Sequence, residues 1–78
     1  MLDAEVFPVE SGRWIAVIKN PAGEFSTEAA SPDEVPGAVW AAIAEVLGEP
    51  VAEHRLVDER GQPWDLAVAE EQARLLDR

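Results

Sequence analysis

The chain has 78 residues, which is enough for one small domain with a single thin core. Sixteen Asp and Glu against six Lys and Arg give a formal charge of −10, which opposes binding to nucleic acid and favours basic protein surfaces. Because cysteine is absent, disulfides, thiolate metal sites and thiol nucleophiles are excluded. No apolar run approaches the roughly 20 residues that span a bilayer, and the N-terminal residues MLDAEVF lack the basic start of a signal peptide. We therefore expect a cytoplasmic protein with no membrane partner.

The first third of the chain predicts three strands joined by tight turns. Residues 4–9 are rich in β-forming side chains, and the SG at 11–12 suits a two-residue hairpin loop. Residues 14–19 (WIAVIK) are the most apolar run and predict the central strand. The NPAG at 20–23 matches a type I turn, and the alternation of residues 24–29 predicts an edge strand.

Counting the register through both turns assigns the side chains to two faces, because cross-strand neighbours share a side of a sheet. We expect Val9 to pair with Trp14 and Ile18 with Phe25. The predicted inner face then consists of Phe7, Val9, Trp14, Ala16, Ile18, Phe25, Thr27 and Ala29. The predicted outer face has an apolar middle and a charged rim: Val6, Pro8, Ile15, Val17, Lys19, Glu24, Ser26 and Glu28.

The SPDE at 31–34 matches a capping box with proline at the first helical position. Pro36 predicts a kink or a restart, so the beginning of this helix is either continuous or a separate turn. Gly48 should end the helix as a left-handed cap. The predicted apolar stripe is Val39, Trp40, Ile43, Val46 and Leu47. The alanine-rich side opposite this stripe predicts a second element packed against it.

Residues 51–57 (VAEHRLV) fit a strand or a short helix, and the following turn DERGQP favours a strand. Asp65 should cap a last helix over residues 66–76, which is the natural cover for the alanine-rich side. The sequence therefore predicts one α+β domain over residues 1–78, with the order β-β-β-α-β-α. It consists of a three-stranded antiparallel meander packed by a helix, then a fourth strand and a C-terminal helix. The predicted core is Phe7, Trp14, Ile18, Phe25, Val39, Trp40, Ile43 and Leu47.

No pattern in the chain predicts catalysis. His54 is the sole histidine and has no Ser, Cys or ligand set at a recognisable spacing, so a solvated side chain is the better interpretation. The adjacent acids point apart on a helix and are explained by capping and solubility. Neither a calcium loop nor a glycine-rich phosphate loop is present. We expect no catalytic residue, no metal ligand and no cofactor, whereas Trp64 suits either a structural role or an interface.

A tight turn before GRWIAVI, a Pro/Gly turn and the run FSTEAASPDEVPGAVWAAI lie between Val6 and Val46. This pattern resembles the HicB-like antitoxin domain and covers about half of the chain. The resemblance implies a domain that binds and blocks a small basic ribonuclease toxin, in a family whose members often carry an appended DNA-binding region. Here the Pro-Gly segment is shortened to 20–23, Ala30 replaces the glycine usual before the capping residue, and no basic ribbon or helix-turn-helix follows Gly48. We therefore expect no direct contact with nucleic acid.

The favoured function is a small acidic protein-binding module that neutralises or recruits a basic protein partner, as an antitoxin or inhibitor does. The candidate partner-binding residues are Val6, Ile15, Val17, Lys19, Glu24 and Glu28. The alternatives are a small enzyme or enzyme subunit with a ligand pocket on the sheet, and a self-associating accessory domain. Because a solvated sheet face is normally polar, we expect the apolar outer face to be covered by a partner, by a second copy in a homodimer, or by the C-terminal segment.

Overall fold

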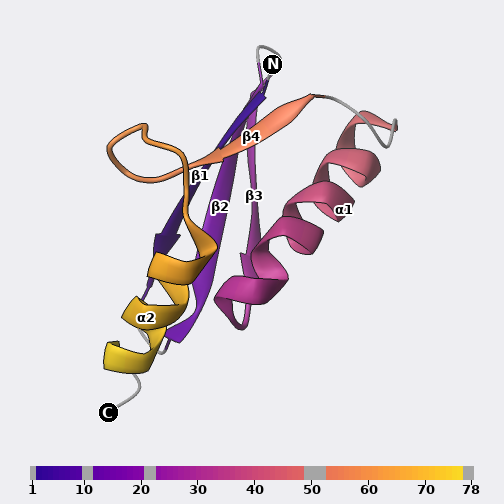
Figure 1. Cartoon of the computed structure of the whole chain (residues 1–78). Coiled ribbons are helices and arrows are strands. Elements are labelled where there is room, and N and C mark those ends of the chain that lie inside the picture. The colour runs from indigo at the N-terminus through magenta and orange to yellow at the C-terminus, as the bar shows by residue number, and fades with distance from the viewer. Residues whose placement is uncertain (1, 10–11, 21–22, 49–52, 77–78) are drawn as a thin grey trace.

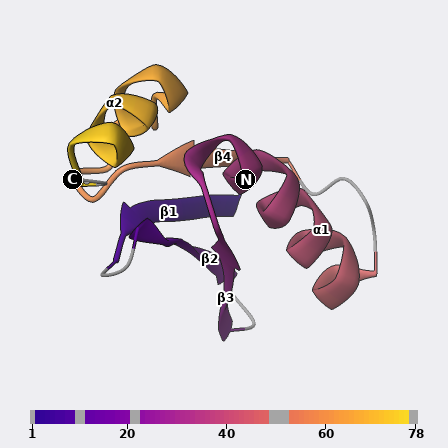
Figure 2. The same ribbon diagram turned by 90° about the horizontal axis from the view of Figure 1, so that it is seen from below.

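A computed structural model describes residues 2–9, 12–20, 23–48 and 53–76, and the side chain of residue 76 is not described. The strands form one mixed sheet in the order β3-β2-β1-β4, accompanied by two helices (Figures 1 and 2). The elements in chain order are β1 (Leu2–Pro8), β2 (Trp14–Asn20), β3 (Gly23–Ala29), the 3₁₀ turn η2 (Pro32–Glu34), α1 (Val35–Leu47), β4 (His54–Val57) and α2 (Leu66–Leu76). The predicted α+β class and element order are confirmed, with β2 inside the sheet and β3 at its edge.

One of the two predicted strand registers is right and the other is wrong by one residue. In the β2–β3 hairpin, Ile18 pairs with Phe25 as expected, because the pairing continues to Asn20 and Gly23 and leaves two residues for the turn. Those two turn residues lie outside the described part. In the β1–β2 hairpin, Trp14 pairs with Pro8 and not with Val9.

The loop between β1 and β2 explains this shift. It spans residues 9–13, and the Val9 N–H donates a hydrogen bond to the Arg13 carbonyl at 2.9 Å. The predicted two-residue loop included Ser11, which is not described, and Gly12, whose φ of +77° is in the region that favours glycine. Because side chains alternate along a strand, the change of one residue reverses every side chain of β1 relative to the prediction.

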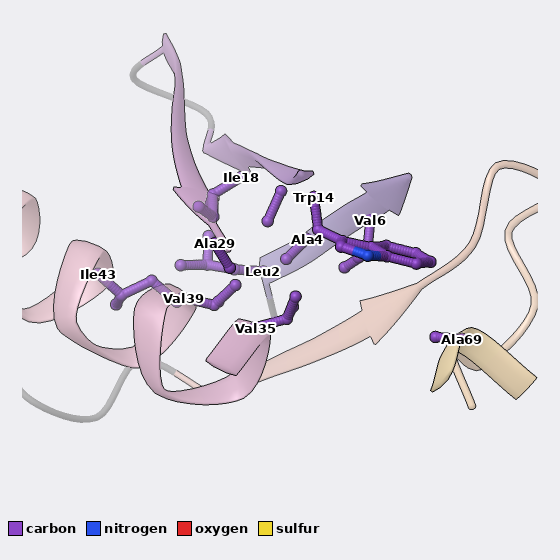
Figure 3. Close-up of a cluster of buried hydrophobic side chains, with 11 residues drawn as sticks. Leu2, Ala4, Val6, Trp14, Ile18, Ala29, Val35, Val39, Ile43 and Ala69 are labelled. Atoms are coloured by element: carbon purple, nitrogen blue, oxygen red, sulfur yellow. The ribbon is translucent and has the colours of Figure 1, made fainter. Parts of the chain in front are cut away.

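The core lies between the sheet and both helices. It is one cluster of buried apolar side chains, which Figure 3 shows gathered from the strands, from α1 and from α2: Leu2, Ala4, Val6, Trp14, Ala16, Ile18, Ala29, Val35, Val39, Ile43 and Ala69. Of the predicted core, Trp14, Ile18, Val39 and Ile43 are buried, and Phe25 and Leu47 pack against the cluster while partly exposed. Phe7 belongs to the other face of the sheet, and Trp40 is 50% exposed, so both of these expectations are wrong.

Helix α1 is rotated about its axis relative to the predicted stripe. Val35, Val39 and Ile43 are its buried residues, and Ala38 and Ala42 pack against the core. Part of the alanine-rich side, Ala38 and Ala42, therefore packs toward the sheet, whereas Ala41 is exposed. The expectation that α2 covers this side is wrong, because α1 packs against β2 and β3 and α2 against η2. Three sheet positions of the cluster are alanines, so a helix can approach the sheet closely there with small side chains of its own.

The predicted ends of the helices are confirmed at Gly48 and Asp65 but not at Ser31. Residues 32–34 form a separate 3₁₀ turn, one of the two predicted outcomes, and α1 begins after it. The capping box is wrong, because the Ser31 hydroxyl donates to the Glu34 carboxylate at 3.2 Å and neither side chain caps a backbone N–H. Gly48 has φ +72° and its N–H donates to the Ala44 carbonyl, which ends α1 as predicted. The Asp65 carboxylate accepts a hydrogen bond from the Ala67 N–H at 2.9 Å and so caps α2 as predicted.

Strand β4 pairs in parallel with β1, and its other edge is covered by the turn that follows. Val57 forms a bridge with Pro63, and the Trp64 N–H donates to the Leu56 carbonyl at 3.0 Å. The Asp58 carboxylate holds this turn by accepting hydrogen bonds from backbone N–H groups within it. Trp64 then packs edge-on against Trp14, with ring centroids 6.2 Å apart, so Trp64 has a structural role.

Candidate functional site

The candidate site is the face of the sheet that points away from both helices. Its apolar centre consists of Phe7 on β1 and Ile15 and Val17 on β2, all partly exposed. Phe7 pairs directly with Ile15, so these two side chains lie on the same face. The intervening residues of β1 and β2 are the buried ones of the core, which places the centre on the opposite side. We call this surface the outer face.

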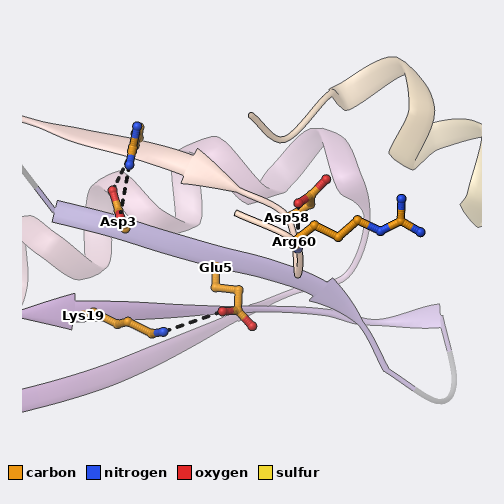
Figure 4. A network of polar contacts seen from close by, with 6 residues as sticks. Asp3, Glu5, Lys19, Asp58 and Arg60 are labelled. Atoms are coloured by element: carbon orange, nitrogen blue, oxygen red, sulfur yellow. Dashed lines mark hydrogen bonds and ion pairs between the residues drawn. The ribbon is translucent and has the colours of Figure 1, made fainter. Parts of the chain in front are cut away.

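Charged side chains surround this apolar centre in three ion pairs. Arg13 pairs with Glu28, Lys19 Nζ lies 3.7 Å from Glu5 Oε1, and Arg55 Nε lies 2.7 Å from Asp3 Oδ1. Figure 4 shows Asp3, Glu5 and Lys19 on β1 and β2, with α1 behind the sheet. All of these side chains are substantially exposed, so each pair contributes little to folding and is weakened further by salt.

The Asp3–Arg55 pair joins the two neighbouring strands β1 and β4. Arg55 also donates from Nη2 to the second carboxylate oxygen of Asp3, at 3.4 Å, so both oxygens are engaged. The hydrogen bond from Arg55 lowers the pKa of Asp3 below its ordinary value, and the same hydrogen bond raises the pKa of Arg55. The pair therefore favours the ionised carboxylate at this edge of the outer face.

Five of the six predicted partner-binding residues lie together on the outer face. Ile15 pairs with Glu28, and Lys19 pairs with Glu24, while Val17 lies between them opposite Ser26. Their environment differs from the prediction in one respect. Glu28 and Lys19 are engaged in ion pairs within the chain, so these charges already have intramolecular partners.

The sixth predicted residue, Val6, is not part of the outer face. It is 2% exposed and lies in the core, because β1 pairs with β2 one residue out of the predicted register. Phe7 takes its place beside Ile15. The signal that identifies Phe7 is the alternation of Leu2, Ala4 and Val6 with Asp3 and Glu5, which places the even residues of β1 inside and the odd ones outside.

The outer face holds little of the chain's excess negative charge. Among the residues that the structure describes, it carries one more acid than base, namely Asp3, Glu5, Glu24 and Glu28 against Arg13, Lys19 and Arg55. The whole chain has a formal charge of −10. Most of the excess acid therefore lies elsewhere, including Asp33 and Glu34 in η2 and Glu70 and Glu71 in α2, two elements in contact with each other.

Helix α1 presents further apolar side chains to solvent. Trp40 is 50% and Val46 is 56% exposed, and Glu45 is the only charged residue in this helix. The sequence pattern did not identify this surface, because a helix that is apolar on every side has no single obvious buried stripe.

A cavity of about 450 Å³ lies on the helical side of the sheet, at the end near Trp14. Val6, Pro8, Trp14, Trp64 and Val68 form its apolar lining, and Asp58, Glu59, Arg60 and Gln72 its polar lining. The Asp58 carboxylate is already engaged by the backbone N–H groups of Arg60 and Gln62, so it serves the turn that it belongs to. The cavity has room for a side chain of a partner.

Within the described residues, no group of three or more His, Cys, Asp or Glu side chains is arranged to hold a metal ion. His54 lies in β4, partly buried, and pairs with Leu2 of β1 in the strand ladder. No helix in the described part of the chain is both long enough and apolar enough to cross a membrane.

Comparisons of this chain with protein-family models, with curated proteins and with solved structures found no match.

Proposed function

We propose that this protein is a small cytoplasmic interaction module that binds a basic protein and thereby neutralises or recruits it, in the manner of a HicB-like antitoxin. The observation that carries this proposal is the apolar centre of the outer face, which neither helix covers. Phe7, Ile15 and Val17 form a contiguous set on neighbouring strands where a solvated sheet face would carry polar side chains. A surface of this kind, with a polar rim, is typical of a protein-binding site.

The net charge selects the chemistry of the partner. At −10 on 78 residues, the field of the protein repels phosphate backbones and a second copy of itself, and attracts basic proteins. A small basic ribonuclease, the kind of target that the HicB-like resemblance implies, meets this requirement. The nucleic acid substrate of such a ribonuclease does not meet it, because its phosphates are negatively charged.

The outer face and the remaining surface would affect different rate constants of this binding. The acids outside the outer face supply the long-range attraction, which raises the association rate. The apolar centre supplies the contact that slows dissociation. Because the rim ion pairs leave the outer face nearly neutral, covering it does not bury a large unpaired charge.

Capture from the organism that encodes the chain, with matched variants as baits, tests this proposal. Ile15→Glu places a charge in the apolar centre, and Leu75→Glu makes the same kind of change at an exposed residue of α2 that does not line the cavity near Trp14. We expect the wild-type and Leu75→Glu proteins to retain the same basic protein and the Ile15→Glu protein to lose it. Circular dichroism should confirm that both variants are folded.

The captured protein is then produced separately for kinetic measurements at low and moderate salt. We expect the association rate constant to fall about tenfold or more as salt rises, and the dissociation rate constant to change much less. If the partner is a ribonuclease, RNA cleavage should fall in proportion to the complex formed. An acidic or neutral partner, salt-independent association, tight binding to free RNA or DNA, or undiminished capture by Ile15→Glu would each contradict the proposal.

Size-exclusion chromatography separates this proposal from the self-associating alternative. If the purified wild-type protein elutes as a dimer and Ile15→Glu elutes as a monomer, the outer face joins two copies of the chain. We expect both proteins to elute as monomers, because the net charge of each copy opposes their association.

A further inference from the structure

The two edges of the sheet are protected to different degrees. Strand β4, at one edge, has four residues, and residues 62–64 fold back along it with hydrogen bonds to Leu56 and Asp58. Strand β3, at the other edge, has seven residues and pairs with β2 along its entire length. Within the described residues, no segment pairs with the free side of β3.

The free side of β3 is a template for a further strand. Because N–H and C=O groups alternate in direction along an antiparallel strand, about half of those in β3 point to the free edge. Native proteins usually block such an edge with charged side chains, lysine above all, or with a proline, a bulge or a covering segment. The described strand has no proline or lysine, and its pairing with β2 is continuous from Trp14–Ala29 to Asn20–Gly23, without a bulge.

The charges on β3 decide what kind of strand fits. Glu24 and Glu28 are exposed on its outer side, two residues to either side of Ser26. A second copy of β3 added antiparallel and centred on Ser26 would place Glu24 opposite Glu28, and like charges directly opposite each other are destabilising. A strand with lysine or arginine at these positions would instead place a cation beside each acid, so that it pairs with Glu24 and shares Glu28 with Arg13.

We infer that β3 accepts an extended basic segment of the protein partner as a fifth strand of the sheet. This inference rests on the proposed function and names how that partner is held. Ile15 pairs with Glu28 and Val17 with Ser26, so a strand added beside β3 continues the outer face directly. On the inner side, the added strand meets the partly exposed ring of Phe25 at the edge of the core, where α1 packs against β3.

The recognition that follows has two parts. The backbone of β3 supplies hydrogen bonds that any extended segment can use, and the side chains of Glu24 and Glu28 select a basic one. Alternation then predicts the pattern of the bound segment, with basic residues toward the outer side and apolar residues toward Phe25. The rest of the partner is brought over the apolar centre of the outer face.

The probe for this inference is a seven-residue peptide of alternating lysine and valine, added to the full-length protein at low salt. Three control peptides accompany it: one with alternating glutamate and valine, one with a central proline, and one N-methylated on two adjacent central residues. The last two keep the basic charge but cannot form a continuous strand. Binding is followed residue by residue through amide hydrogen exchange and NMR chemical shifts.

We expect the lysine-valine peptide to slow the exchange of alternate β3 amides by about tenfold at saturation, with little change at β4. The glutamate, proline and N-methylated peptides should give no such protection. Glu24→Lys should weaken binding of the lysine-valine peptide at least about fivefold, since it replaces a cross-strand attraction by a repulsion. Glu71→Lys changes the net charge equally on exposed α2 and should weaken binding much less.

Three results would overturn the inference. One is equal binding of the N-methylated and unmodified lysine-valine peptides, because charge alone would then account for it. Another is binding that shifts only residues of the outer-face centre or of α2, with unprotected β3 amides. The third is no binding of the lysine-valine peptide at low salt. In each case the proposed function is judged separately, by whether Ile15→Glu loses the captured basic protein.

Discussion

Ile43 offers the sharpest test of how this small domain is held together. It is 1% exposed and contacts the core from the middle of α1. Ile43→Ala removes three carbons, which at about 0.8 kcal/mol per buried methylene is roughly 2.4 kcal/mol of transfer free energy. The cavity left behind raises the expected loss to about 2–5 kcal/mol. A domain of 78 residues has a free energy of unfolding of only about 4–12 kcal/mol, so this loss is a large fraction of the total and should lower the midpoint of unfolding clearly.

Val46 provides the matched control, since it lies on the same helix and is 56% exposed. Val46→Ala should change the free energy of unfolding by less than about 0.5 kcal/mol. Urea unfolding followed by circular dichroism measures both variants, and the two transitions should have the same slope if the unfolded states are alike. Equal midpoints for the two variants, or a lower midpoint for Val46→Ala, would refute the assignment of the buried side of α1.

Three further predictions follow from particular side chains. Arg55 lowers the pKa of Asp3, so their pair stabilises the fold above the unfolded pKa of Asp3. This contribution is lost as pH falls through the lower, folded pKa. In urea unfolding, the free energy of unfolding of Asp3→Asn should therefore fall less steeply below about pH 4 than that of the wild-type protein. Replacing both Glu24 and Glu28 by threonine removes the like charges of the β3 edge and should produce concentration-dependent self-association in size-exclusion chromatography. Trp40→Phe should leave the free energy of unfolding within about 0.5 kcal/mol, because the ring is half exposed.

Much of the fold could be predicted because the local signals were unambiguous. The turn between Asn20 and Gly23 allowed one register, which fixed the pairing of β2 with β3 and the edge position of β3. Gly48 and Asp65 ended one helix and began another by local hydrogen bonds that depend on few distant residues. Local chemistry of this kind can be interpreted from sequence with no knowledge of the tertiary packing.

The errors arose where the sequence fits two arrangements nearly equally well. Strand β1 has apolar residues on both sides, and the loop length decided which side faces the helices. Helix α1 is apolar around most of its circumference, so its rotation depends on the surface that it meets. That surface is rich in alanine, and it selected Ala38 and Ala42 for close packing and left Trp40 outside.

The sequence placed the residues of the candidate site correctly on β2 and β3 and wrongly on β1. Ile15, Val17, Lys19, Glu24 and Glu28 share a face because β2 and β3 were placed correctly, whereas Val6 was lost with the register of β1. The ion pairs of the rim could not be predicted in the same way. Each joins residues on different strands or loops, and a shift of one residue would separate them.

These ion pairs change the physical account of binding. Sequence alone suggested that Glu24 and Glu28 meet the basic partner directly, but Glu28 is already paired with Arg13 within the chain. Under the proposed function, the attraction of a basic protein would therefore come mainly from acids outside the outer face, whose field acts over about 8–10 Å at moderate salt.

Glu24 differs from Glu28 in this respect. It lies opposite Lys19, but in the described part of the chain the ion pair of Lys19 is with Glu5. Glu24 is thus an acid of the outer face that an incoming basic strand can meet without first breaking an ion pair. For this reason a charge reversal at Glu24 separates selection by the β3 edge from attraction by the whole molecule.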